Sequence, residues 1–226
     1  MKINKKNYVS FLLGAILMLG VGCNQVQSSQ PSESPAIEST PTVENSTNTP
    51  DVADKTPVVT ETLPIGSVVT VDGSEEKYMV IAHDYIVEEM PDITWQYAAC
   101  LYPEGNISAK PAMAFNNEDI KEVLFEGLKT TEGCNLAVYE VKEGYLPLGT
   151  VVQAEGLETP LMIFGRSQQL SGTEQKYDYA ACEYPAGNIS PEETYVLNNE
   201  DISSLYFLGY IDDEEEAFKE KLLQAK

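Results

Sequence analysis

Short apolar stretches alternate with polar positions along the chain from about residue 63 to residue 210. Stretches of this kind, rich in β-branched and aromatic residues and bounded by Gly, Pro, Asn and Asp, are typical of β-strands. The strands expected on this basis are 68–71, 77–83, 97–102 and 122–125, followed by 151–154, 161–166, 179–184 and 205–208. The pattern therefore predicts a mainly β protein.

The two sets of strands belong to an internal repeat with a period of about 82 residues. Roughly 25 of about 66 aligned positions are identical between the copies, which indicates a duplication. The repeated motifs include Leu63-Pro64-Ile65-Gly66 with Leu146-Pro147-Leu148-Gly149, Tyr97-Ala98-Ala99-Cys100 with Tyr179-Ala180-Ala181-Cys182, and Asn116-Asn117-Glu118-Asp119-Ile120 with Asn198-Asn199-Glu200-Asp201-Ile202. We therefore expect a first repeat domain at 63–145 and a second at 146–226.

Each copy is expected to form a small antiparallel domain of about five strands, either an SH3-like barrel or a curled sheet. A copy of about 80 residues supplies only a marginal core, so the two copies should pack on each other. After Asp212 the apolar period becomes helical, and Asp212 or Asp213 can cap a C-terminal helix. Residues 131–142 occupy the equivalent place after the first copy, and their sequence fits either a helix or a strand.

Comparison of the copies assigns faces to the strands. Glu183 replaces Leu101, so that face tolerates charge, and the face with Ala180, Cys182 and Tyr184 should point inward. Cys100 and Cys182 are accordingly expected to be small buried hydrophobic residues. The same reasoning assigns four further residues to the core, namely Val123, Phe125, Leu205 and Phe207.

The N-terminal residues have the features of an export signal. Three lysines precede an apolar run, Tyr8 to Leu19, of about a dozen residues, which is too short to span a bilayer. The segment Leu19-Gly20-Val21-Gly22-Cys23 resembles a lipobox, which implies cleavage after residue 22 and lipidation of Cys23. Residues 23–62 are rich in Ser, Thr and Pro and are expected to be a disordered tether. We expect a lipoprotein on the extracytoplasmic face of the cell membrane.

The charge of the chain restricts its partners. With 14 basic and 36 acidic residues the net charge is −22, and three of the lysines belong to the expected signal peptide. Nucleic acid and anionic headgroups both require basic surfaces, so neither is an expected partner. Basic proteins and divalent cations remain open. If Cys23 is lipidated, three cysteines remain, and an odd number excludes a complete disulfide framework.

These motifs resemble the family called domain of unknown function 4176, found mostly in low-GC Gram-positive bacteria. The second copy matches its pattern nearly throughout, with Leu161-Met162-Ile163-Phe164-Gly165-Arg166, Tyr177-Asp178-Tyr179, Tyr184-Pro185-Ala186-Gly187 and Phe207-Leu208-Gly209-Tyr210. The first copy departs at Ala82-His83, Gln96 and Leu128. The resemblance implies no catalytic residue or cofactor. Members often occur near type VII secretion genes, an association that suggests an accessory role.

Candidate chemistry is sparse. His83, the single histidine, aligns with Arg166, so a general base here would be confined to the diverged copy. We expect no catalytic residue, metal site or cofactor. The acidic pairs Glu118-Asp119 and Glu200-Asp201 could hold a divalent cation weakly. We prefer the alternative that Asn116 and Asn198 cap a short helical turn that begins with acids.

The residues predicted to bind a ligand are Arg166, Asp178 and Tyr210, which the second copy retains, together with Tyr102 and Tyr184 of the Tyr-Pro turns. Two structural alternatives stay open: Arg166 and Asp178 could form an ion pair within the sheet, and the Tyr-Pro-x-Gly motifs could simply be tight turns. The sequence favours a membrane-anchored lipoprotein with a non-catalytic binding or accessory role and an envelope or secreted protein as partner. An enzyme acting on an envelope polymer, and an accessory protein of type VII secretion, are the alternatives.

Overall fold

The structure is a computed structural model that describes residues 61–106, 111–140, 144–169 and 174–225. The expected signal peptide and residues 23–60 of the expected tether, including Cys23, lie outside the described residues. The elements of the first copy are β1 (Val68–Val71), β2 (Lys77–Ile86), β3 (Thr94–Tyr102), β4 (Met113–Phe115), the 3-10 turn η2 (Asn117–Asp119) and β5 (Ile120–Phe125). After them come β6 (Ala137–Val138), β7 (Val151–Ala154), β8 (Leu161–Gln169), β9 (Lys176–Glu183), η3 (Pro191–Glu193), β10 (Tyr195–Leu197), η4 (Asn199–Asp201), β11 (Ile202–Phe207) and α1 (Asp213–Gln224).

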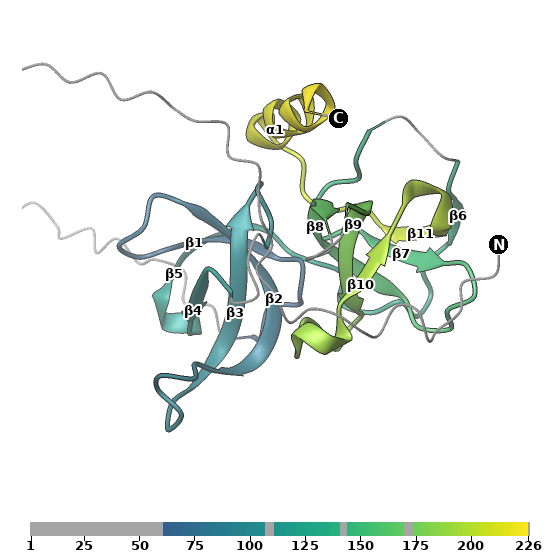
Figure 1. Ribbon diagram of the computed structural model, residues 1–226. Coiled ribbons are helices and arrows are strands. Elements are labelled where there is room, and N and C mark those ends of the chain that lie inside the picture. The colour runs from purple at the N-terminus through teal and green to yellow at the C-terminus, as the bar shows by residue number, and fades with distance from the viewer. Residues whose placement is uncertain (1–60, 107–110, 141–143, 170–173, 226) are drawn as a thin grey trace, which may run out of the picture. The chain divides into compact units, whose positions relative to one another are not determined.

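The strands form two antiparallel sheets, which Figure 1 shows together with α1. The first has the order β4-β3-β2-β1-β5, and the second has the order β10-β9-β8-β7-β11-β6. Within the described ranges no strand pairing joins the two ends of either sheet, so each is an open, curled sheet and not a closed barrel. The predicted mainly β fold is confirmed. None of the helices in the described ranges is long and apolar enough to cross a membrane.

The duplication is visible in the details of strand pairing. The register between β2 and β3 shifts between Val80 and Ala82, and the register between β8 and β9 shifts at the equivalent positions, Ile163 and Gly165. Such bulges bend a strand and increase its twist, so both copies curl at the same place. The sequence did not predict β4 and β10, which are only three residues long and too short for a visible alternation.

The segment after the first copy forms a strand in the sheet of the second copy. Ala137 and Val138 pair with Leu205 and Ser204 of β11, so β6 becomes the last strand of that sheet. This settles the open question for residues 137–138, which are strand. The two copies are therefore joined by more than surface packing, because the tail of one extends the sheet of the other.

One hydrophobic cluster joins buried residues of both copies, from Leu63 to Ile202. Ala180, Cys182 and Tyr184 are buried as predicted, and so is Cys100. The prediction that Val123, Phe125, Leu205 and Phe207 are core was too strong, because all four are only partly buried. They lie on β5, which is the edge strand of the first sheet, and on β11, which has only the two-residue strand β6 beyond it.

The copies meet through hydrogen bonds that come in equivalent pairs. The backbone N–H of Asn106 donates to Phe164 O at 2.9 Å, and that of Asn188 donates to Ile81 O at 2.8 Å. These residues occupy matching positions in the two copies, so the interface is isologous, with the same surface used on both sides. The two repeats therefore pack like the subunits of a symmetric dimer within one chain.

Two glycines make this close approach feasible. Gly105 and Gly187 both have φ of +87°, in the left-handed region that side chains disfavour. A Cβ at Gly105 would lie 2.8 Å from Phe164 O, and one at Gly187 would lie 2.7 Å from Ile81 O. The Tyr-Pro-x-Gly motifs are thus turns, as one alternative held, and their glycines also let each copy contact the other.

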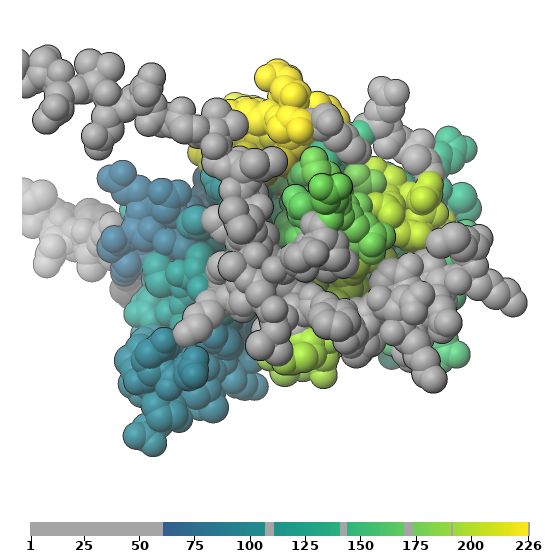
Figure 2. All heavy atoms as spheres, in the orientation of Figure 1, coloured from purple at the N-terminus to yellow at the C-terminus, as the bar shows by residue number. Residues whose placement is uncertain are grey.

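The C-terminal helix α1 begins as the sequence predicted. Asp212 is the N-cap, and its side chain accepts a hydrogen bond from the backbone N–H of Glu215. Acidic residues fill the first turn, where the helix dipole favours negative charge. Figure 2 shows α1, in yellow, at the surface of the protein. Among the described residues of α1, Glu215 is the one that is buried, and its carboxylate pairs with Arg166.

Candidate functional site

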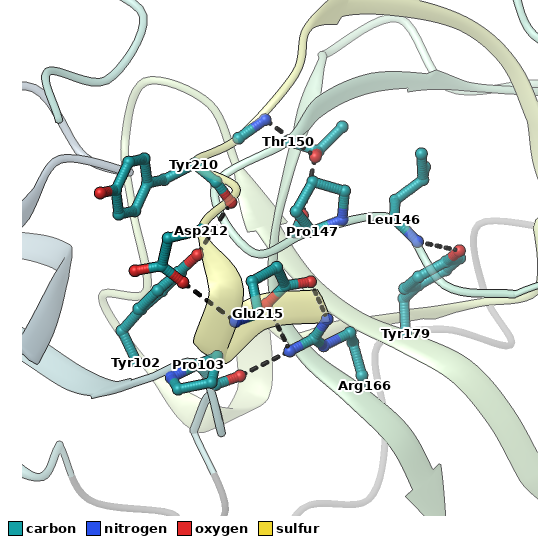
Figure 3. A network of polar contacts seen from close by, with 11 residues as sticks. Tyr102, Pro103, Leu146, Pro147, Thr150, Arg166, Tyr179, Tyr210, Asp212 and Glu215 are labelled. Atoms are coloured by element: carbon teal, nitrogen blue, oxygen red, sulfur yellow. Dashed lines mark hydrogen bonds and ion pairs between the residues drawn. The ribbon is translucent and has the colours of Figure 1, made fainter. Parts of the chain in front are cut away.

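Arg166 on β8 stands at a junction of three segments. Figure 3 shows its guanidinium directed at Glu215 of α1 and at Pro103 of the first copy. Nη1 and Nη2 donate to the two carboxylate oxygens of Glu215, and the Nη2–Oε2 distance is 3.0 Å. Nη2 also donates to Pro103 O at 2.5 Å, and the guanidinium carbon lies 5.2 Å from the centre of the Phe218 ring. One side chain thus ties the second sheet, the helix and the first copy together.

The burial of this junction sets its electrostatics. Arg166 is 2% exposed and Glu215 is 1% exposed. Burial raises the pKa of Glu215 above its ordinary value, and the positive charge of Arg166 and the hydrogen bonds from it oppose that rise. Two ion pairs at the helix start add to the contact: Lys77 Nζ lies 2.7 Å from Asp212 Oδ2 and 2.9 Å from Glu214 Oε2. Burial lowers the pKa of Lys77, but the two carboxylates outweigh it and the net direction is upward.

Tyr102 and Tyr184 occupy equivalent places on opposite sides of the interface. The hydroxyl of Tyr102 donates to Tyr210 O at 2.9 Å, and the hydroxyl of Tyr184 donates to Leu128 O. Burial raises the pKa of both hydroxyl groups. The ring of Tyr210 lies 5.5 Å from that of Tyr102, centre to centre. Both hydroxyls therefore serve as donors that fix the chain directly after β5 and β11.

Asp178 lies apart from this junction and holds the start of η4. Its carboxylate accepts hydrogen bonds from the backbone N–H of Asn199 at 3.0 Å and from Asn199 Nδ2 at 3.3 Å. The suggested ion pair between Arg166 and Asp178 is wrong, because Arg166 pairs with Glu215. Sequence reasoning missed Glu215, which lies 49 residues away and looks like one acid in a run of five.

Of the five predicted ligand-binding residues, the structure brings Arg166 and Tyr210 of the second copy together with Tyr102 of the first. Tyr184 is the counterpart of Tyr102 in the second copy and contacts Leu128 instead. Arg166, Tyr102 and Tyr184 are buried, while Tyr210 and Asp178 are partly buried. No ligand tests a binding role, which stays a prediction. Their contacts are those of residues that hold the fold. The tyrosines that both copies share in β3, β9 and the Tyr-Pro turns form no exposed aromatic surface, because Tyr97, Tyr102, Tyr179 and Tyr184 are all buried.

The acidic pairs also have structural partners. Asp119 accepts a hydrogen bond from the backbone N–H of Asn116 at 2.9 Å, and Asp201 does the same for Asn198 at 2.8 Å. Asn116 and Asn198 are the N-caps of η2 and η4, as the preferred alternative held. No cluster of three or more candidate metal ligands occurs within the part of the chain that the structure describes.

The remaining residues with potential chemistry are packed into the strands. His83 Nε2 is 2.8 Å from Leu63 O, and its ring packs edge-on against Tyr97. Cys100 and Cys182 are free thiols. Burial raises the pKa of Cys100 to about 12, and it raises the pKa of Cys182 as well. A thiol held protonated in this way is a poor nucleophile.

The surface of the second copy has an apolar groove that sequence reasoning did not find. It has a volume of about 440 Å³ and lies between β6, the end of β11, the chain from Gly144 to Pro147, and Lys219 of α1. Its apolar lining includes Val138, Tyr145, Leu146, Leu205, Leu208 and Ile211. Val138 is 83% exposed, Leu208 47% and Ile211 44%. Exposed apolar surface gathered in this way is typical of a binding site.

The first copy shows that the fold does not require these apolar side chains. Glu126 and Lys129 occupy the positions equivalent to Leu208 and Ile211, and they form an ion pair of 2.8 Å. The same pair of positions is thus charged in one copy and exposed and apolar in the other. This difference between the copies was the sequence signal that could have identified the groove.

The fold and its contacts define a tandem-repeat β protein, in which two homologous open sheets share one core and an isologous interface. The chain belongs to the family described as Domain of unknown function (DUF4176), whose model matches residues 62–136 and again residues 145–218. The resemblance found in the sequence is therefore confirmed for both copies. No curated protein matches the chain, and no solved structure matches it.

Proposed function

We propose that this protein is a surface lipoprotein, anchored to the cell membrane through Cys23, whose folded part is a non-catalytic binding module for an envelope or secreted protein. The observation that carries the binding role is the groove at Leu208 and Ile211. The exposed parts of aliphatic side chains reduce solubility, and the first copy folds with Glu126 and Lys129 at these positions instead. Binding of a partner would bury these apolar side chains and so accounts for their presence.

A second argument concerns the polar residues that both copies share. Catalysis needs polar groups that converge on an open site where a substrate can lie. Here Tyr102 and Tyr184 donate to backbone carbonyls, and the shared Asn-x-Glu-Asp motifs cap turns. These groups are occupied in holding the chain, which favours a module that presents a surface over one that performs chemistry.

The binding role is tested by capture from the protein's own envelope and secreted proteins. The bait is the chain from Asn24 to Lys226, which keeps every residue of the hydrophobic cluster. The variant is Leu208→Glu with Ile211→Lys, which copies the first repeat and leaves the net charge unchanged. Ile86→Thr, which trims an exposed aliphatic side chain elsewhere, is the control. The double variant should lose the captured protein and the control should keep it. Equal capture by all three would contradict the proposal.

The anchoring is tested separately with Cys23→Ser in the producing cells. Without the thiol no diacyl chain can be attached, and two acyl chains are what makes such an anchor stable. The protein should appear in the medium or remain as an uncleaved precursor. A processed Cys23→Ser protein that stays on the membrane would show that the anchor is elsewhere.

A further inference from the structure

The groove lies beside an open sheet edge. β6 is the last strand of its sheet within the described residues, and Tyr139 N–H donates inward to Ser203 O at 3.1 Å. In an antiparallel ladder successive residues direct their N–H and C=O groups to opposite edges. Val138 therefore directs its backbone groups outward, away from β11. An outward row of this kind can pair with an added strand.

The first sheet protects its corresponding edge. Its last strand, β5, carries exposed Lys121 and Glu122, and charged side chains on an edge discourage pairing with another chain. β6 carries Ala137 and Val138 instead, with exposed Leu136 just before them. Of the two edges, the one beside the groove is thus the one without protection.

The charge around this edge restricts what can pair with it. Glu140, two residues after β6, lines the groove. On α1, exposed Glu216 lies one turn before Lys219, which also lines the groove, so the two share a helix face. The whole chain has a net charge of −22. Within the groove lining Glu140 and Lys219 offset each other, so the acidic balance of the whole chain decides the preference. A second copy of this chain or an acidic segment would be repelled, whereas a basic segment would be attracted.

We propose that β6 and the groove bind an extended segment of a basic polypeptide. The segment adds a strand beside Val138, places a bulky apolar side chain in the groove against Leu208 and Ile211, and directs Lys or Arg side chains toward Glu140 and Glu216. This inference rests on the proposed binding function and names the chemical class of the partner.

The probes are two synthetic peptides of alternating sequence, Lys-Val-Lys-Leu-Lys-Val-Lys and its counterpart with Glu in place of each Lys. Titrated into the chain from Asn24 to Lys226 and followed by amide NMR, the Lys peptide should shift signals of residues 136–140, 208 and 211. It should slow hydrogen exchange at Val138 N–H. The Glu peptide should bind about tenfold more weakly or worse. The Leu208→Glu, Ile211→Lys variant should lose about tenfold in affinity for the Lys peptide, and Ile86→Thr should lose none.

Backbone methylation tests the pairing itself. Two versions of the Lys peptide carry N-methyl groups on alternate residues, one on the odd positions and one on the even positions. An added strand uses one edge of the peptide, so one version should lose binding and the other should keep it. Equal affinities for the Lys and Glu peptides, equal binding by both methylated versions, or an unchanged Val138 exchange rate would each overturn the inference.

The outcome is separable from that of the proposed function. If the double variant loses its captured envelope protein while the Lys peptide fails to bind the unaltered chain, the basic-strand inference is wrong and the binding function stands. If capture is equal for all variants, the binding function itself is wrong.

Discussion

Removal of the Arg166 side chain should destabilise the protein strongly. Arg166→Ala leaves Glu215 buried without its partner and leaves Pro103 O without its donor. Breaking a buried ion pair by removing one member costs about 3–5 kcal/mol of unfolding free energy. The measurement is urea unfolding of the chain from Asn24 to Lys226, followed by tyrosine fluorescence and circular dichroism. His83→Ala, at the equivalent position of the first copy, is the control and should cost about 1 kcal/mol.

The pH dependence gives this prediction a second readout. Burial already raises the pKa of Glu215, and loss of Arg166 removes the charge that opposed the rise. In the variant the folded state therefore holds the Glu215 proton more tightly than the unfolded state does. Stability gained from that proton is lost as pH rises above the ordinary value of 4.5. The deficit of Arg166→Ala should accordingly be largest near neutral pH and should shrink as pH falls toward 4.5.

A compensating variant separates the ion pair from general disruption. Replacing both members, Arg166→Met with Glu215→Leu, removes the buried charges together, and such replacements are often neutral or stabilising. The double variant should therefore recover most of the stability that Arg166→Ala loses. A cost of less than about 1 kcal/mol for Arg166→Ala would contradict this reasoning, since exposed pairs contribute that little.

Three further predictions concern the interface, the helix and the thiols. Gly187→Ala should lower the free energy of unfolding by at least about 2 kcal/mol more than Gly73→Ala in urea unfolding. Both substitutions strain a backbone with positive φ, but only a Cβ at Gly187 would clash with a carbonyl oxygen of the other copy. Equal losses of stability would argue against this close contact. Asp212→Ala should cost about 1 kcal/mol more than Asp212→Asn, because both variants lose the ion pair with Lys77 but Asn still caps the helix. Equal costs for the two variants would show that the cap is unimportant. Cys100 should resist maleimide at neutral pH in the folded protein and react once urea unfolds it, since burial raises its pKa to about 12; rapid labelling of the native thiol would refute its burial.

Much of the fold could be predicted because the chain contains two versions of the same pattern. β1 matched its predicted bounds, and the Asn-x-Glu-Asp turns and the cap of α1 were also identified in advance. These features are local, so short motifs carry the information. β6 could not be assigned, because two residues show no period and their partners on β11 lie more than 60 residues later.

The candidate site was harder to predict for a physical reason. Arg166 was expected at a functional surface because the second copy keeps the family residue, but its role depends on Glu215 and on Pro103, which lie far away in sequence. A charged residue is usually exposed unless it is paired, and the sequence does not reveal the pair. The groove is likewise assembled from the tail of the first copy, the end of β11 and α1.

The central claim, that this protein binds a partner at the groove beside β6, is most directly tested by photo-crosslinking from position 138. A photoreactive phenylalanine analogue replaces Val138 in the full chain within the producing cells, and a second chain carries it at Ile86 as the control. We predict a discrete adduct with another polypeptide from position 138, which disappears when Leu208→Glu and Ile211→Lys are added, and none of that adduct from position 86. The account would be contradicted if position 138 gave no adduct, or if the same adduct persisted in the Leu208→Glu, Ile211→Lys chain.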